Sequence, residues 1–171
     1  MAKQLPAVLK NYNVLVDGDS YACTAKTIEL PEIVKKTEEY RGAGMIGDID
    51  LDMGFEKMES TITYTGVDSR HFAQLAKCGV SDLPIRYVGA YERQDICKHV
   101  IREVYMRGSL KEFQLGEMEL GSINEQELLY GVTYLKVVDD GFELCEIDLV
   151  NGICILGGVD KTSQINALLG L

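Results

Sequence analysis

The chain has 171 residues, of which 46% are hydrophobic and 26% are charged, a balance typical of one folded globular domain. No apolar run approaches the ~20 residues that a membrane helix needs, so we expect no membrane insertion. A surplus of acidic residues gives a net charge of −10, which argues against a general nucleic-acid binder that works by neutralising phosphates. The 17 glycines favour a turn-rich β protein.

The first predicted elements are strands joined by tight turns. Residues 13–16 and 21–30 lie on either side of an Asp-Gly turn, so we expect them to pair as a hairpin. Residues 33–40 form the next predicted strand. Residues 58–65 alternate most clearly, with Met, Ser, Ile and Tyr on one face and mainly Glu and Thr on the other.

A short helix is predicted to follow Asp68. Phe72 and Leu75 share one face at helical spacing, which predicts that this face packs on the core and that His71 lies on the polar side. Gly79 stands where a left-handed residue commonly ends a helix.

Strand patterns return in the second half of the chain. After Phe113 and Leu115, Gly116 shifts the apolar alternation to Met118 and Leu120, which indicates a bulge or bend in a continuing strand. The predicted strands in this half cover residues 83–91, 97–107, 111–115, 128–138 and 142–149.

One of these strands has an unusual apolar pattern, and a helix near the C-terminus completes the predicted elements. Residues 128–138 carry apolar side chains on both faces, so this strand needs cover on both sides, from a helix or from another subunit. Residues 160–169 form a predicted amphipathic helix, with Asp160 as N-cap and Gly170 at its end.

Two motifs imitate binding sites but lack the necessary context. Residues 42–47 match G-x-G-x-x-G, yet a polar segment precedes them and a strand pattern follows, so we interpret them as a surface loop and not as a dinucleotide site. Asp48, Asp50 and Asp52 have the spacing of an EF-hand loop, but Met stands where that loop needs Gly. We therefore predict no cofactor and no metal.

Cysteine and histidine usage argues against catalysis. His71 and His99 have no partner at the spacing of a metal site or a nucleophile–base pair, so we expect the chain not to be an enzyme. The five cysteines form no C-x-x-C pair and are predicted to be reduced, buried thiols: Cys23, Cys78, Cys97, Cys145 and Cys154.

Acidic residues concentrate between residues 109 and 150. Ten acidic residues in this block face only two cations, Lys111 and Lys136, which gives the block a net charge of −8. The block is either a solubilising face or an electrostatic surface for a partner or a passage.

Several blocks of the sequence resemble a known family. Residues 36–45 (KTEEYRGAGM) and 49–56 (IDLDMGFE) are similar to the Lys-x-Glu-x-Tyr-Arg-x-Gly-Gly/Met and Asp-Met-Gly-Leu-Glu blocks of the major tail tube proteins of contractile-tailed bacteriophages. Further similar blocks follow in the same order, at residues 106–108, 111–112, 116–117, 134, 146–148, 151–152 and 158–160. The tube proteins of R-type tailocins are also closely similar to this pattern.

The resemblance implies a single tail tube domain over residues 1–171, mainly β with one or two short helices, with a small barrel- or sandwich-like fold. It implies hexameric rings that stack inside a contractile sheath and form a conduit for a genome or for ions. The implied partners are other copies, sheath, baseplate and terminator proteins, and a tape measure protein or DNA in the lumen. The implied location is the virion tail, assembled in the bacterial cytoplasm. The alternatives are a monomeric β-barrel that binds a small ligand and a tube protein of a type VI secretion-like system.

Three surfaces are predicted for this function. An extended loop or hairpin at residues 41–59 is expected to contact the next ring, with candidates Arg41, Gly42, Gly44, Gly47, Asp48, Asp50 and Asp52. The strand at residues 128–138 is expected to contact a neighbouring subunit through Leu128, Tyr130, Val132 and Tyr134. The acidic candidates for the lumen or the sheath-facing surface are Glu112, Glu117, Glu119, Glu125 and Glu127.

Overall fold

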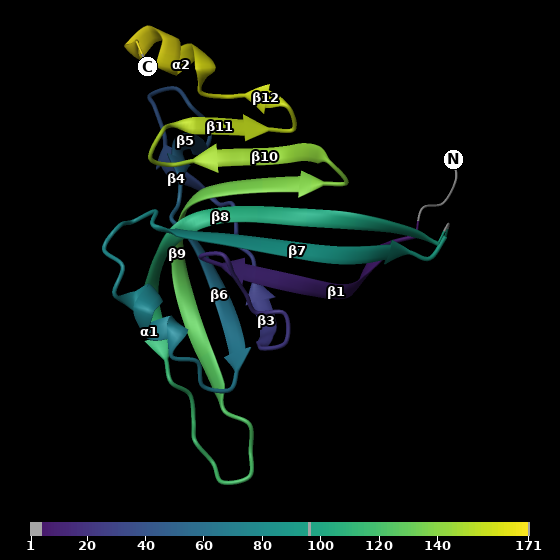
Figure 1. The fold of residues 1–171 in the computed structure, drawn as a ribbon. Coiled ribbons are helices and arrows are strands. Elements are labelled where there is room, and N and C mark those ends of the chain that lie inside the picture. The colour runs from purple at the N-terminus through teal and green to yellow at the C-terminus, as the bar shows by residue number, and fades with distance from the viewer. Residues whose placement is uncertain (1–4, 96, 171) are drawn as a thin grey trace.

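The computed structural model describes residues 5–95 and 97–170. These residues form a mainly β fold with two short helices, as predicted (Figure 1). In chain order the elements are β1 (Ala7–Val16), β2 (Asp19–Ser20), β3 (Ala25–Glu29), β4 (Lys35–Tyr40), β5 (Ile49–Phe55), β6 (Met58–Thr65), α1 (Arg70–Leu75), β7 (Leu83–Arg93), β8 (Lys98–Gln114), β9 (Glu125–Asp139), β10 (Phe142–Asp148), β11 (Ile153–Leu156), β12 (Val159–Asp160) and α2 (Ser163–Leu169).

One open sheet contains all of the described strands except β4 and β5. Its main order is β12-β11-β10-β9-β8-β7-β1-β2, and β3 pairs with β6, which pairs with β9. Two strands pair with the edge of β9 that faces away from β8: β6 pairs with residues 125–132, and β10 pairs with residues 134–139. The ends of this order do not pair with each other in the described chain, so the fold is not a closed barrel.

Two glycines allow β8 and β9 to approach closely where the pairing changes. A Cβ on Gly108 would lie only 1.9 Å from the carbonyl oxygen of Gly131. The register between the strands shifts between Arg107 and Gly108. Such an irregularity bends a strand, and here it lies next to Val132, where the β6-paired half of β9 ends.

The core lies between the two halves of the folded sheet. The predicted alternation of β6 is confirmed, since Met58, Ser60, Ile62 and Tyr64 are buried and the residues between them are not. Ser60 is the polar member of this set, and its Oγ donates to the Glu29 carbonyl oxygen at 2.7 Å. The other fully buried large side chains include Tyr21, Leu83, Ile85, Met106, Leu128, Tyr130, Leu135 and Ile147.

The partner of the third strand differs from the prediction. The turn after β1 forms as expected, with Asp17 and Gly18 at positive φ, but only β2 returns along β1. Tyr21 then directs the chain away, because its carbonyl oxygen accepts from the amides of Thr24 and Ala25 and its side chain is buried. As a result β3 pairs with β6, and the predicted pairing of residues 21–30 with residues 13–16 is wrong.

Helix α1 has the opposite orientation to the prediction. His71 and Gln74 are buried, whereas Phe72 and Leu75 are about half exposed. The polar face is inside because Gln74 bonds to two buried tyrosines and because the His71 ring packs against aromatic rings. The helix also ends earlier than predicted, with Ala76 and not Gly79 at its C-cap.

The long strand β8 replaces two shorter predicted strands. It runs without interruption through residues 108–110, with register shifts against β9 in place of a break. Gly116 does not bend a continuing strand; it lies just beyond the end of β8, at φ +75°, and opens a loop over residues 115–124. Met118 and Leu120 are therefore exposed loop side chains.

Helix α2 follows the prediction with one change at its start. The helix begins at Ser163, and Thr162 is its N-cap. The predicted cap, Asp160, still accepts hydrogen bonds at the start of the helix: its Oδ1 accepts from the amides of Thr162 and Ser163, each at 2.9 Å. Gly170 ends the helix at φ +75°, as predicted. Neither described helix is long and apolar enough to cross a membrane.

The cysteines differ in burial. Cys145 and Cys154 are buried, as predicted. Cys23, Cys78 and Cys97 are exposed, so the prediction of buried thiols is wrong for these three, which lie in turns and loops that the core does not reach. All five are free thiols.

Candidate assembly surfaces

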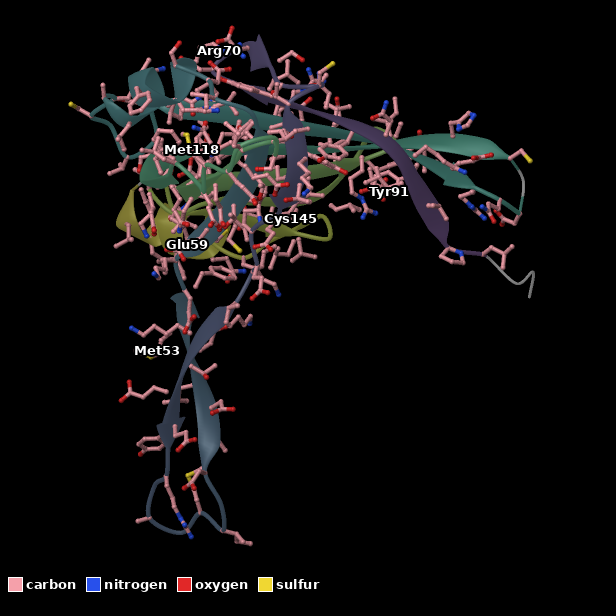
Figure 2. The ribbon with its side chains drawn as sticks, turned by 90° about the horizontal axis from the view of Figure 1, so that it is seen from below. Met53, Glu59, Arg70, Tyr91, Met118 and Cys145 are labelled. Atoms are coloured by element: carbon pink, nitrogen blue, oxygen red, sulfur yellow. The ribbon has the colours of Figure 1, made fainter. Side chains whose placement is uncertain are left out.

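The hairpin formed by β4 and β5 projects away from the rest of the subunit (Figure 2). Because directly paired residues in an antiparallel ribbon point to the same side, the register of β4 and β5 assigns the two faces of the hairpin. Tyr40 pairs with Ile49, and Glu38 pairs with Leu51, so these four side chains share one face. Met53, two residues after Leu51, belongs to the same face.

The opposite face of the hairpin is acidic. Glu39 pairs with Asp50, and Thr37 pairs with Asp52. The Lys35 ammonium lies 2.7 Å from Oδ2 of Asp52, and this hydrogen bond, together with one from the Gly54 amide, holds the pKa of Asp52 below its usual value.

The turn of the hairpin contains the glycine motif. Arg41 holds the turn, since its Nε lies 3.9 Å from Oδ1 of Asp48 and its Nη2 donates to the Ile46 carbonyl oxygen at 3.3 Å. Gly44 has φ +91°, which an L side chain rarely adopts. The motif therefore joins two antiparallel strands, which is the surface loop that we expected and not the strand–helix junction of a dinucleotide site.

The predicted interface strand lies inside the subunit. Leu128, Tyr130 and Val132 on β9 are 0–3% exposed, between β6 and β8. Their side chains are covered by the subunit's own core, so the prediction that they contact a neighbouring subunit is wrong for these three. The apolar residues on both faces of β9 reflect burial within one subunit.

Tyr134, the fourth residue of that prediction, lies on the other face of the sheet. Its hydroxyl donates to Oε1 of Glu146 at 2.8 Å, and the Arg107 guanidinium lies 5.4 Å above its ring. Partial burial, assisted by the Glu146 carboxylate, raises the pKa of Tyr134 to about 12. Around it, a groove of about 560 Å³ is lined by both charges and aromatic rings, among them Arg86, Glu103, Tyr105 and Lys136.

Two groups of carboxylates from the acidic block lie at opposite ends of β9. At one end of β9, Asp139 pairs with Arg102 at 2.6 Å and Asp140 pairs with Lys98 at 2.8 Å. At the other end, around the loop at residues 115–124, the acidic candidates are exposed: Glu112, Glu117, Glu119, Glu125 and Glu127. Within the described chain, Glu125 is the member of this set that has an ion pair, with Lys26.

This loop is held in place by its last residue. Asn124 Nδ2 donates to the carbonyl oxygens of Leu115 and Glu117, at 3.1 and 3.0 Å. The Asn124 carbonyl oxygen accepts from the Gly66 amide at 2.8 Å. The loop is the lowest part of the subunit in Figure 1, so its carboxylates form an acidic end of the molecule.

Sequence reasoning missed the apolar face of the hairpin and the outward face of α1. The first had a readable signal, because residues 48–53 alternate strictly between Asp and Ile, Leu or Met. The second had none, because helical spacing assigns Phe72 and Leu75 to a common face without showing which way that face points.

The family model and two similar sequences are tail tube proteins that match most of the chain. The phage tail tube protein FII family matches residues 6–170. The tail tube protein of Escherichia phage P2 is 38% identical over 170 residues, which cover 98% of this chain and 99% of that protein. The major tail tube protein of Serratia phage KSP20 is 29% identical over 151 residues, 87% of this chain and 86% of that protein.

Solved structures share the fold at low sequence identity. The sheath/tube terminator structure of the extracellular contractile injection system PVC, in its extended state, has a chain that matches with a TM-score of 0.61 at 11% identity, over 80% of this chain and 99% of that chain. The cap of the anti-feeding prophage matches with a TM-score of 0.61 at 12% identity, over 81% and 94%. With the family match over almost its full length, this chain belongs to the phage tail tube protein FII family.

Proposed function

We propose that the chain assembles into hexameric rings, and that these rings stack into the inner tube of a contractile tail. The observation that carries the proposal is the 38% identity with a phage tail tube protein over practically the whole of both chains. The tube is a conduit for a genome or for ions into the target bacterium.

Free sheet edges support closure into a ring. Residues 7–13 of β1 pair with β7 on one side, and in the described chain no strand pairs with their other side. At the far end of the sheet, β12 is two residues long, and β11 is the one strand that pairs with it among the described residues. Head-to-tail contact between these two different edges, repeated around a ring, leaves neither of them unpaired. This replaces side-chain contacts of β9 as the proposed subunit interface.

The projecting hairpin supports contact between rings. Its turn and acidic face contain the candidates Arg41, Gly42, Gly44, Gly47, Asp48, Asp50 and Asp52. These residues remain a proposal, supported by the distance to which the hairpin extends from the subunit (Figure 2).

The acidic end of the molecule is proposed to face the lumen or the sheath. Carboxylates repel DNA phosphates in a lumen, and on the outer wall they form weak, exposed ion pairs with a basic partner. The proposed partners are sheath, baseplate and terminator proteins, with a tape measure protein or DNA transiently inside. The proposed location is the virion tail, assembled in the host cytoplasm.

Size-exclusion chromatography and negative-stain microscopy of the purified chain test this function. Rings or rods are expected at high protein concentration. A strict monomer at every concentration contradicts the proposal and favours the monomeric ligand-binding alternative, whose site would be the groove next to Tyr134.

A further inference from the structure

Helix α1 presents an apolar face to the outside of the subunit. Phe72 is 52% exposed and Leu75 is 47% exposed, while the polar residues His71 and Gln74 fill the buried side. A surface helix normally has the reverse arrangement. An exposed apolar face on a helix whose polar groups are buried indicates a surface that another molecule covers.

The hairpin has a second uncovered apolar face. Tyr40, Ile49, Leu51 and Met53 lie on one side of it and are 42–55% exposed. A two-stranded ribbon is marginally stable on its own and normally packs against another element. Since the hairpin projects away from its own subunit (Figure 2), the cover for this face comes from outside the subunit.

The two apolar faces belong to opposite sides of the molecule. In Figure 2, Arg70 at the start of α1 lies at the top of the body, and the hairpin with Met53 extends from the opposite side, below the body. Identical copies that stack head to tail bring the projecting part of one copy to the opposite side of the next copy. The stacking direction therefore brings the hairpin of one ring to the α1 side of the adjacent ring.

Charged side chains lie at the rims of the two faces. Arg70 begins α1 and Lys77 lies just beyond its end. Each already has an ion pair in its own subunit, Arg70 with Asp68 and Lys77 with Asp17, and their side chains remain 44% and 34% exposed. Glu38 lies on the apolar face of the hairpin, opposite Leu51, and has no ion pair within the described residues. A second copy thus supplies an apolar partner for this face, together with two partly exposed cations at its rim.

We propose that the hairpin face formed by Tyr40, Ile49, Leu51 and Met53 packs on Phe72 and Leu75 of a second copy in the adjacent ring. Glu38 then joins the ion pair of Arg70 or Lys77 of that copy, and the acidic face of the hairpin points away from α1, so Asp48, Asp50 and Asp52 contact other parts of the adjacent ring. The inference rests on the proposed tube function and assigns the receptor of the hairpin. A small patch suffices because all copies in a ring dock at once.

Charge-swap variants of the full chain test the contact. Leu51→Lys and Leu75→Glu are each expected to lower the sedimentable tube fraction by at least about tenfold, because each replaces an apolar side chain of the contact with a charged one. The double variant is expected to return the fraction to within about twofold of wild type, because the new charges pair. Phe72→Glu is a second α1 variant, with circular dichroism as the folding check, since Phe72 also packs on Phe113.

Thr37→Lys is the matched control, since it adds the same charge to the same hairpin on the opposite face, and a clearly smaller loss of tubes than that of Leu51→Lys is expected. If Leu51→Lys blocks stacking while folded Leu75→Glu and Phe72→Glu variants form normal tubes, the hairpin docks elsewhere; this overturns the inference and leaves the tube function intact. Failure of the swap to restore tubes overturns the direct contact. If the wild-type chain forms neither rings nor tubes, the proposed function itself fails.

Discussion

The Tyr130 hydroxyl on β9 donates a hydrogen bond of 2.8 Å to Oε1 of Gln74 on α1. The same amide donates through Nε2 to the Tyr21 hydroxyl at 3.0 Å. One glutamine side chain, 5% exposed, therefore joins the helix to two separate parts of the core. This bridge holds α1 in the orientation that turns Phe72 and Leu75 outward.

Gln74→Leu should destabilise the subunit by about 2–6 kcal/mol, because it leaves two buried hydroxyls without this partner at about 1–3 kcal/mol each. Urea unfolding followed by circular dichroism measures the change. Gln114→Leu is the matched control, because Gln114 is exposed at the end of β8, and its effect should stay within about 0.5 kcal/mol. Equal effects of the two variants would show that the bridge contributes nothing.

Buried His71 should make stability depend on pH. Its ring centroid lies 4.5 Å from that of Tyr64 and 5.6 Å from that of Tyr21. Burial lowers the pKa of His71, and the opposing effect of nearby Asp68 is smaller. The unfolded chain therefore binds a proton more readily, so stability is lost as the pH falls below about 6.5 towards the lower pKa of the folded state.

His71→Phe should remove this part of the pH dependence, because phenylalanine keeps an aromatic ring and does not titrate. Unfolding free energies at pH about 7.5, 6.5 and 5.5 measure the slope on both sides of the ordinary histidine pKa. His99→Phe should keep the wild-type slope, because His99 is exposed in β8. A His71→Phe variant with the wild-type slope would assign the pH dependence to other groups.

Gly108→Ala should destabilise the fold by about 3 kcal/mol or more, because the new Cβ would lie 1.9 Å from a backbone oxygen of β9 and the strands would have to separate. Thermal unfolding and denaturant titration measure the loss. Gly47→Ala is the control: its Cβ would meet no atom within 4 Å, and it should be neutral or slightly stabilising. A tolerated Gly108→Ala would mean that the bend at Gly108 adjusts freely.

Local patterns in the sequence predicted the positions of the strands better than they predicted which strands pair. The alternation at residues 58–65 was sufficient to place Met58 and Ile62 in the core, because a half-buried strand has only two faces. The pairing of β3 with β6 depends on the turn at Tyr21, where burial of one side chain redirects the chain, and no local period shows this.

At the candidate site, too, the sequence indicated the local segment but not its distant contacts. The resemblance indicated the hairpin segment, and the structure shows the ribbon and its register. The inverted face of α1 depends on the bonds from Gln74 to Tyr21 and Tyr130, which are distant in sequence. The double-sided apolar pattern of β9 was misread because burial by a neighbouring strand and burial by a neighbouring subunit leave the same pattern.

Reversal of Glu112, Glu117 and Glu119 to Lys should leave the subunit folded and weaken its contact with a basic sheath surface. All three side chains are exposed and make no ion pair within the described residues, so unfolding should change by no more than about 0.5 kcal/mol each. Their field reaches only about 8 Å at physiological salt, so it acts on whatever lies directly against the tube wall. Exposed pairs of about 1 kcal/mol or less would release easily when a sheath contracts.

Co-expression with the cognate sheath protein, followed by electron microscopy, measures how many tubes are sheathed. The Lys variant should form bare tubes of normal length, and the matched triple Gln variant should give an intermediate sheathed fraction, because it removes the attraction without adding repulsion. Sheathing of the Lys variant at the wild-type level, with normal contraction and delivery, would show that this acidic end serves solubility alone. Loss of the tubes themselves would place the three carboxylates in a contact between tube subunits.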